Sequence, residues 1–339
     1  MYESSFHLRK NSFQLSADPE FLYLTLQHKE VLAGLLYAIL FRKGLVTLIG
    51  EAGTGKTTLL AEALRQIPLD RLRSSVILNP CLTPPEFMEL SLLDFGMKPI
   101  PESKAQRVWL FQEMLLKTYA EGKIATLVVD EAHKLSPEVL EEIRLLGNFE
   151  FSDQKLLQII MVGQPELAEV LNQSQLRQLK QRIAIRLTIQ PLSDADVVKY
   201  LEYRWKQAGG SAVPFDTKAT GAIARLSGGL PRLINSICDN ALITAFGEGT
   251  ETVRLEHVET AARDLDLVHR TPWKDTASVP LPPAPRAEQS LLTKEDADQS
   301  PKHERPALTL NFAGVESVRP TIFGRWAGRL GLTHQNGRS

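Results

Sequence analysis

This sequence of 339 residues has few cysteines, almost no net charge and no long apolar run. Its two cysteines, Cys81 and Cys238, stand far apart and fit no metal-ligand spacing, which excludes a disulfide scaffold and favours a reducing compartment. Lysine and arginine number 39 against 40 aspartates and glutamates, so no global basic field predicts binding to nucleic acid or to an anionic membrane. The longest apolar run, residues 31–41, has about half the length that spans a bilayer, and no secretory signal is expected. We therefore expect a soluble, cytoplasmic protein.

One stretch matches the phosphate-loop pattern of glycine, four residues and Gly-Lys-Ser/Thr: Gly50-Glu51-Ala52-Gly53-Thr54-Gly55-Lys56-Thr57-Thr58. An apolar, β-branched run (45–49) precedes it and a segment of helical periodicity (59–64) follows, so the loop is expected between a strand and a helix. Its glycines let backbone N–H groups approach a phosphate closely. Lys56 is then placed to reach the β- and γ-phosphates, and Thr57 to offer its hydroxyl to Mg²⁺. The alternative is a glycine turn that binds nothing.

Two adjacent carboxylates, Asp130 and Glu131, end the apolar segment 124–130. Acids at the end of a buried strand are costly unless they have a role in a site. Paired with a phosphate loop, the first is expected to hold Mg²⁺ through its waters and the second to polarise the water that attacks the γ-phosphate. An exposed helix cap is the alternative for both.

Gln164 directly follows another apolar segment, residues 156–163. A polar group there is expected in the crevice at the carboxyl ends of the strands, where ligands bind in open α/β sheets. It is predicted to sense the γ-phosphate or orient water, and the alternative is that its amide caps the helix begun by Pro165.

Alternation of apolar strands with helical segments up to about residue 190 predicts a doubly wound parallel sheet with helices on both faces. Beyond it the pattern is helical only, which predicts a small all-helical lid. The expected strands are 45–49, 75–78, 124–130, 156–163 and 183–189, and the expected lid helices are 194–208, 216–226, 230–246 and 255–265. We expect an aromatic strap and helix (1–44) that pack on the nucleotide-binding domain (45–191), then the lid (192–267), then a linker and tail (268–339).

Two basic elements are candidates for contact with a phosphate. Arg232 follows Gly228-Gly229-Leu230-Pro231, so it projects from the first turn of a helix, where an arginine can meet a phosphate from outside the sheet. Arg182 and Arg186 lie where a basic helix runs into the last strand. For all three the alternative is a surface charge. In the tail, apolar residues recur at helical spacing between 322 and 330, and this segment either docks on a partner or membrane surface or is a plain tail.

Together these motifs resemble the AAA+ ATPases. The resemblance narrows to the ExeA/GspA-type ATPases of general secretion, a group related to the ATPases that regulate transposition, through five phrases: Met1-Tyr2, Asp18-Pro19-Glu20-Phe21-Leu22-Tyr23, His28-Lys29-Glu30, the phosphate loop, and Gln181-Arg182-Ile183.

This resemblance implies ATP and Mg²⁺ as cofactors, bound by Lys56, Thr57 and Asp130, with Glu131 as the catalytic acid residue. It makes Gln164 the first sensor and Arg232 the second sensor. Arg182 becomes the arginine finger, with Arg186 as the alternative. Members of the group work as oligomers with the site at the subunit boundary, so a homo-oligomer is expected.

Two functional classes remain open. The first is an ATPase that drives or times assembly of a bacterial envelope system, either secretion or polysaccharide export, through protein partners, with peripheral contact at the inner membrane through the tail. The second is a DNA-associated regulator of transposition. The balanced charge and the N-terminal phrases favour the first.

Overall fold

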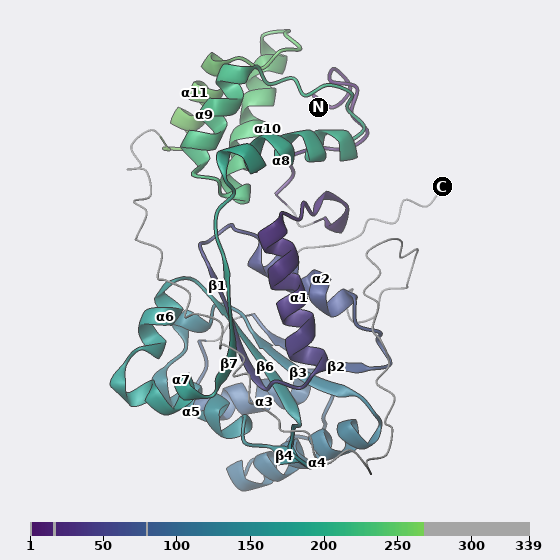
Figure 1. Ribbon diagram of the computed structural model, residues 1–339, viewed down its shortest axis with the longest axis vertical. Coiled ribbons are helices and arrows are strands. Elements are labelled where there is room, and N and C mark those ends of the chain that lie inside the picture. Colours follow the sequence, from purple (N-terminus) through teal and green to yellow (C-terminus); the bar gives the residue numbers. More distant parts are fainter. Residues whose placement is uncertain (1, 16–17, 79–80, 268–339) are drawn as a thin grey trace, which may run out of the picture. The chain divides into compact units, whose positions relative to one another are not determined.

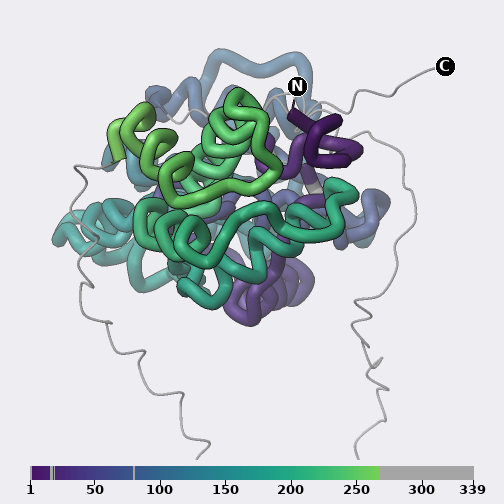
Figure 2. The backbone as a smooth tube through the Cα atoms, turned by 90° about the horizontal axis from the view of Figure 1, so that it is seen from above, coloured from purple at the N-terminus to yellow at the C-terminus, as the bar shows by residue number. Residues whose placement is uncertain are grey.

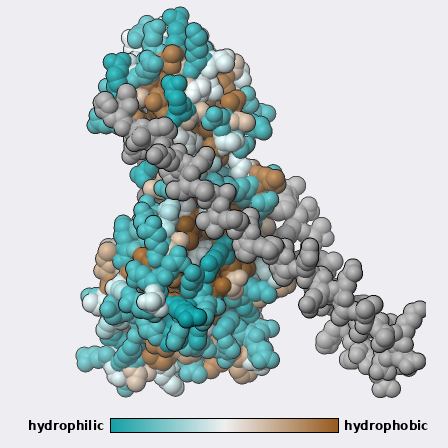
Figure 3. Space-filling model, turned by 60° about the vertical axis from the view of Figure 1, so that its left-hand side comes forward, coloured by the Kyte–Doolittle hydropathy of each residue, from teal (hydrophilic) through white to brown (hydrophobic). Residues whose placement is uncertain are grey.

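The computed structural model describes residues 2–15, 18–78 and 81–267. The predicted linker and tail lie outside these residues. In the described part, no helix combines the length and the apolar character needed to cross a bilayer. The face in Figure 3 is mostly hydrophilic, with apolar residues scattered over it.

Five parallel strands form the central sheet, in the order β2-β3-β6-β1-β7 (Figure 1). They are β1 (Leu45–Gly50), β2 (Leu72–Ile77), β3 (Ile124–Val129), β6 (Leu157–Gly163) and β7 (Ile183–Ile189). The central strands β3 and β6 are buried along their whole length, which explains why they read as continuous apolar runs. The edge strand β7 alternates between exposed and partly buried residues until the buried Ile189.

Helices cover both faces of the sheet because successive strand side chains point in opposite directions. Leu127 and Val129 of β3 belong to one apolar core, with residues of α3 (Pro84–Asp94), α4 (Lys104–Ala120) and α5 (Pro137–Leu146). Ile124 and Val128 belong to the opposite core, with α1 (Leu26–Leu40) and α2 (Lys56–Arg65). Short elements complete this part: α6 (Glu166–Leu171), α7 (Arg177–Gln181) and the hairpin β4 (Glu150–Phe151) and β5 (Gln154–Lys155).

Four helices follow the sheet, as predicted: α8 (Asp194–Gln207), α9 (Thr217–Ser227), α10 (Pro231–Gly247) and α11 (Leu255–Asp264). Two of these helices have N-caps whose side-chain oxygens accept a hydrogen bond: Ser193 accepts from the Asp196 N–H, and Asp216 accepts from the Ala219 N–H. The predicted fold class, a parallel sheet with helices on both faces followed by an all-helical domain, is confirmed.

The N-terminal strap packs in a different place from the one predicted. Tyr2, Phe6, Phe13 and Phe21 belong to the core of the helical domain. Figure 2 shows the purple N-terminal segment beside the green helices of this domain. Phe6 and Phe13 contact the ring of Trp205, which explains the preference of this strap for α8. The strap therefore packs on the helical domain and not on the nucleotide-binding domain as predicted, whereas residues of α1 share a core with the sheet.

Polar contacts fasten the strap as well. The buried Arg204 donates from Nε to the Ser12 carbonyl at 2.5 Å and lies over the ring of Phe21 at 4.8 Å. The hydroxyl of Tyr2 bonds Asp239 of α10 at 2.5 Å. The first residues of the chain thus complete a domain that comes last in the described sequence.

Removing the ring at the centre of this packing should destabilise the helical domain. Phe13 is fully buried, and truncation of a buried phenylalanine costs about 3–5 kcal/mol. We expect Phe13→Ala to speed amide hydrogen exchange in α8 and α10 by about 10²-fold or more. Leu15→Ala is the matched control, because Leu15 lies in the same strap and is 61% exposed. Equal protection in the two variants would contradict the packing role.

Candidate nucleotide site

The phosphate loop connects β1 to α2, as the motif requires. Gly53 has φ of 84° and Gly55 has φ of 90°, both in the left-handed region that favours glycine. Gly55 is the N-cap of α2, so the helix begins at Lys56, three residues before the segment of helical periodicity 59–64. The free N–H groups and the dipole of this helix start therefore face the loop, which suits an anion.

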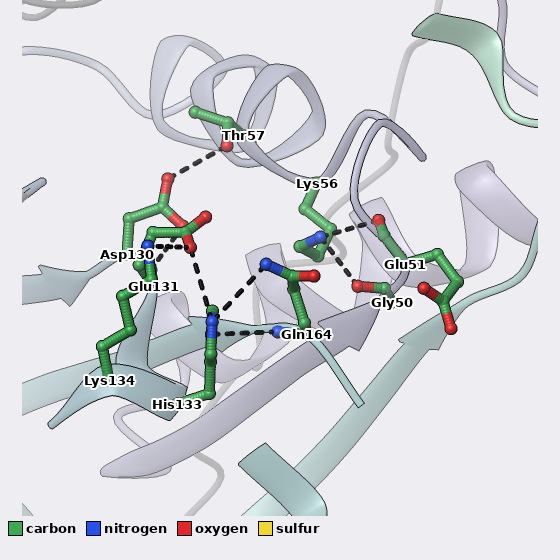
Figure 4. A network of polar contacts seen from close by, with 9 residues as sticks. All are labelled: Gly50, Glu51, Lys56, Thr57, Asp130, Glu131, His133, Lys134 and Gln164. Atoms are coloured by element: carbon green, nitrogen blue, oxygen red, sulfur yellow. Dashed lines mark hydrogen bonds and ion pairs between the residues drawn. The ribbon is translucent and has the colours of Figure 1, made fainter. Parts of the chain in front are cut away.

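Lys56 is buried, and its ammonium lies against the loop backbone. Its Nζ donates to the carbonyl oxygens of Gly50 at 2.7 Å and Glu51 at 2.8 Å (Figure 4). Burial lowers the pKa of Lys56, and the nearby carboxylates of Asp130 and Glu131 oppose this shift. The cation is thus held inside the loop that it is predicted to share with phosphate.

The loop and the acid-bearing strand meet at the pair Thr57 and Asp130. The Thr57 hydroxyl donates to Oδ2 of Asp130 at 3.0 Å, and the Glu131 N–H donates to Oδ1 at 2.8 Å. Burial raises the pKa of the Asp130 carboxyl, and these two hydrogen bonds oppose the rise. An alcohol oxygen beside a carboxylate oxygen is a donor set that Mg²⁺ accepts. Within the described residues no group of three or more His, Cys, Asp or Glu could hold a metal ion.

Glu131 has an unusual backbone conformation, with φ of 52° in the left-handed region. For a residue other than glycine this conformation is uncommon and clusters at functional sites. Its Oε2 lies 3.2 Å from Nζ of Lys134 and 3.6 Å from Nε2 of His133. Ser136 caps α5 by accepting from the Val139 N–H, and Glu131 precedes the 3-10 turn Ala132–Lys134 as its N-cap residue without a side-chain capping hydrogen bond.

Gln164 directly follows β6, and its amide contacts His133. The Gln164 backbone N–H donates to Nδ1 of His133 at 3.4 Å, and its side-chain Nε2 is 3.4 Å from the His133 Nε2. Pro165 is the N-cap of α6 and no side-chain hydrogen bond caps this helix, so the capping alternative for Gln164 is wrong. Figure 4 shows both acids, His133 and Gln164 in one connected set.

Sequence reasoning missed the contact between His133 and Gln164. The position of His133 two residues after Glu131 was visible, but nothing in the sequence indicated that its ring would meet Gln164, 31 residues away. One pattern in the sequence could have indicated this contact. A histidine follows the acid-bearing strand, and a polar residue also follows the next apolar strand along the chain.

Arg232 comes close to the phosphate loop through its backbone. Its N–H lies 3.3 Å from the Gly53 carbonyl oxygen, and a Cβ on Gly53 would lie 2.9 Å from the Cβ of Arg232. The side chain itself is exposed. The structure thus brings Arg232 to the loop, and its contact with a phosphate remains a prediction.

Arg182 lies far from the phosphate loop of its own chain. Ile189 pairs with Gly50, and Arg182 precedes Ile189 by seven residues, about 23 Å along an extended strand. Arg186 precedes it by three, about 10 Å. Both side chains are exposed. The Arg182 guanidinium donates to the Arg144 carbonyl at 3.2 Å, and the Arg186 guanidinium donates to the Lys180 carbonyl at 3.4 Å. Arg182 cannot serve its own site in this arrangement.

A family model described as an AAA domain matches residues 16–171. General secretion pathway protein A of Aeromonas hydrophila is 41% identical over 266 residues, which make up 78% of this chain and 48% of that protein. The matched part is therefore about half of the secretion protein.

Two further similarities are more distant. The ATP-dependent target DNA activator B of Escherichia phage Mu is 28% identical over 249 residues, 70% of this chain and 72% of that protein. Among solved structures, the ORC2 protein of Aeropyrum pernix superposes with a TM-score of 0.57 at 16% identity, covering 75% of this chain and 71% of that one. At this identity the likeness shows the fold alone. The phosphate loop, the acid-bearing strand and these similarities agree: residues 16–171 match an AAA domain, and the chain resembles general secretion pathway protein A over 266 residues.

Proposed function

We propose that the chain binds ATP and hydrolyses it to ADP and phosphate. One observation carries this proposal: Lys56, the Thr57–Asp130 pair, Glu131 and Gln164 come from separate segments and converge at the carboxyl edge of the sheet. Lys56 binds the β- and γ-phosphates, exchanging its loop carbonyls for phosphate oxygens. Glu131 polarises the attacking water, and Gln164 contacts the γ-phosphate.

A bound Mg²⁺ would neutralise charge that develops on the phosphates, and Thr57 and Asp130 are the residues that would hold it. Their adjacent oxygens suit its coordination. Arg232 approaches from the helical domain, so closing this domain over the loop would add positive charge. Phosphate release with ATP and Mg²⁺, absent when EDTA replaces Mg²⁺, tests the proposal, and a pure protein that binds ATP without releasing phosphate at any concentration would overturn it.

The proposed cellular role is based on the relative with the higher sequence identity, general secretion pathway protein A. We propose a nucleotide-dependent homo-oligomer that drives or regulates assembly of a bacterial envelope system, either secretion or polysaccharide export, through protein partners. The 41% identity to a protein named for general secretion supports this role. We place the protein in the cytoplasm, with peripheral contact at the inner membrane.

A second role, that of a DNA-associated regulator of transposition, is favoured by one observation. The phage Mu relative, named as a target DNA activator, matches along 72% of its own length. The near-balance of 39 basic and 40 acidic side chains weighs against this role, because binding to DNA depends on neutralised phosphates.

Salt dependence separates the two roles. We expect no affinity for duplex DNA beyond the non-specific range of roughly 10⁻⁴–10⁻⁶ M, and no change on adding ATP. Fluorescence anisotropy of a labelled duplex at about 50 and 200 mM salt measures it, with Lys56→Ala as the control for nucleotide effects. An ATP-dependent affinity that falls by about 10³-fold or more across this range indicates six or more phosphate contacts and would favour the DNA role.

A further inference from the structure

His133 lies between two residues of the proposed reaction and has no role of its own in it. It belongs to the short 3-10 turn Ala132–Lys134 that leaves β3, and its side chain is 11% exposed. One ring nitrogen accepts from the backbone of Gln164, and the other faces both the Gln164 amide at 3.4 Å and the Glu131 carboxylate at 3.6 Å. The ring therefore contacts both groups at once.

The hydrogen bonds determine which ring nitrogen carries the proton. Because Nδ1 accepts from the Gln164 N–H, the proton of the neutral imidazole lies on Nε2. A donor at Nε2 is best satisfied by oxygen, so the Gln164 amide should present its Oε1 to the ring and its NH₂ away from it. That orientation leaves two N–H donors of Gln164 free for a phosphate oxygen.

The same Nε2–H also faces Glu131. At 3.6 Å the contact is longer than a hydrogen bond, while Lys134 holds the same carboxylate oxygen at 3.2 Å. A small rotation of the Glu131 side chain would bring its carboxylate to the ring. Since Lys134 is exposed, its ion pair constrains Glu131 only weakly, and the less exposed ring of His133 is the firmer support.

We propose that His133 is a positioning residue, which orients the amide of Gln164 toward the γ-phosphate and supports the carboxylate of Glu131 toward the attacking water. This inference rests on the proposed function. It predicts a loss in turnover without a loss in ATP affinity, because His133 touches neither the phosphate loop nor the Thr57–Asp130 pair in any contact described. Losing such support lowers rates by about 10–100-fold.

Two substitutions form a matched pair for the test. Glutamine reaches far enough to place an N–H donor near the position of Nε2, whereas the shorter asparagine reaches only the position of Nδ1. We expect His133→Ala and His133→Asn to lower kcat by about 10–100-fold with KM changed less than about threefold, and His133→Gln to recover part of kcat. Binding of a fluorescent ATP analogue reports separately that each variant keeps its nucleotide loop.

A double variant tests whether His133 acts through Gln164. We expect His133→Ala combined with Gln164→Ala to lose less than the product of the two single losses. Unchanged kcat in all three His133 variants, or strictly multiplied losses together with no rescue by glutamine, would overturn the inference. If the wild-type protein itself releases no phosphate, the proposed function fails instead, so the two failures are distinguishable.

Discussion

Glu131→Gln is expected to bind ATP with unchanged affinity and to lose hydrolysis by about 10²–10⁴-fold, the usual contribution of a positioned general base. The amide keeps the shape of the side chain and removes the charge that polarises water. Glu131 contacts His133 and Lys134 and not the loop, so the phosphate cradle is left intact. Calorimetry with ATP and single-turnover phosphate release measure the two effects separately.

Lys56→Ala, in contrast to Glu131→Gln, should lose affinity for ATP. Its ammonium is the charged group held inside the loop, so its loss removes charged hydrogen bonds to phosphate and lowers ATP affinity by about 10²-fold. Glu138→Gln, an exposed acid in the first turn of α5, is the control and should alter neither quantity. Equal losses of affinity in the Lys56 and Glu131 variants would contradict the roles proposed for both.

The strands of the sheet could be predicted where burial on both faces makes them apolar. The segments at β1, β3 and β6 matched within about a residue for this reason, and β7 matched although only its last residue, Ile189, is buried. β2 begins at Leu72, whereas the prediction began at 75. The prediction was late because Arg73, Ser74 and Ser75 break the apolar run. Ser75 is nonetheless fully buried, and Arg73 bonds the Phe95 carbonyl, so tertiary contacts decide what the local pattern does not.

The packing of the strap and the contacts within the site could not be predicted from the sequence alone. Aromatic residues at 2, 6 and 13 indicate that the strap must pack somewhere, but not that Trp205 of α8 is the partner, since any apolar face satisfies them. Similarly, the spacing of the phosphate loop predicts a site by itself, whereas the contact of Gln164 with His133 depends on β3 and β6 being neighbours. Motifs within one segment are therefore predictable, and contacts between segments need the fold.

The position of Arg182 has a consequence for how the protein is regulated. Hydrolysis needs positive charge against the γ-phosphate, and Lys56 and Arg232 come from the subunit that binds the nucleotide. Arg182 is about 23 Å along β7 from the level of Gly50 and exposed, so within one chain it is remote from that charge. A neighbouring copy is the remaining place where it can act on a phosphate. An isolated subunit should therefore be nearly inactive.

We expect Arg182→Ala to bind ATP and to lose hydrolysis by about 10³–10⁵-fold, the contribution of an arginine finger in the GTPase precedents. Activity per subunit should rise with protein concentration, because a complete site needs two chains. Mixing Arg182→Ala with Lys56→Ala should restore part of the activity, since an intact loop from one chain then meets an intact Arg182 from the other. Arg186→Ala is the matched comparison, because Arg186 lies only about 10 Å along the strand from the level of Gly50. A larger loss of hydrolysis in Arg186→Ala than in Arg182→Ala would transfer the role of arginine finger to Arg186. Constant activity per subunit down to concentrations at which the protein is monomeric would show that no finger is supplied by a neighbour.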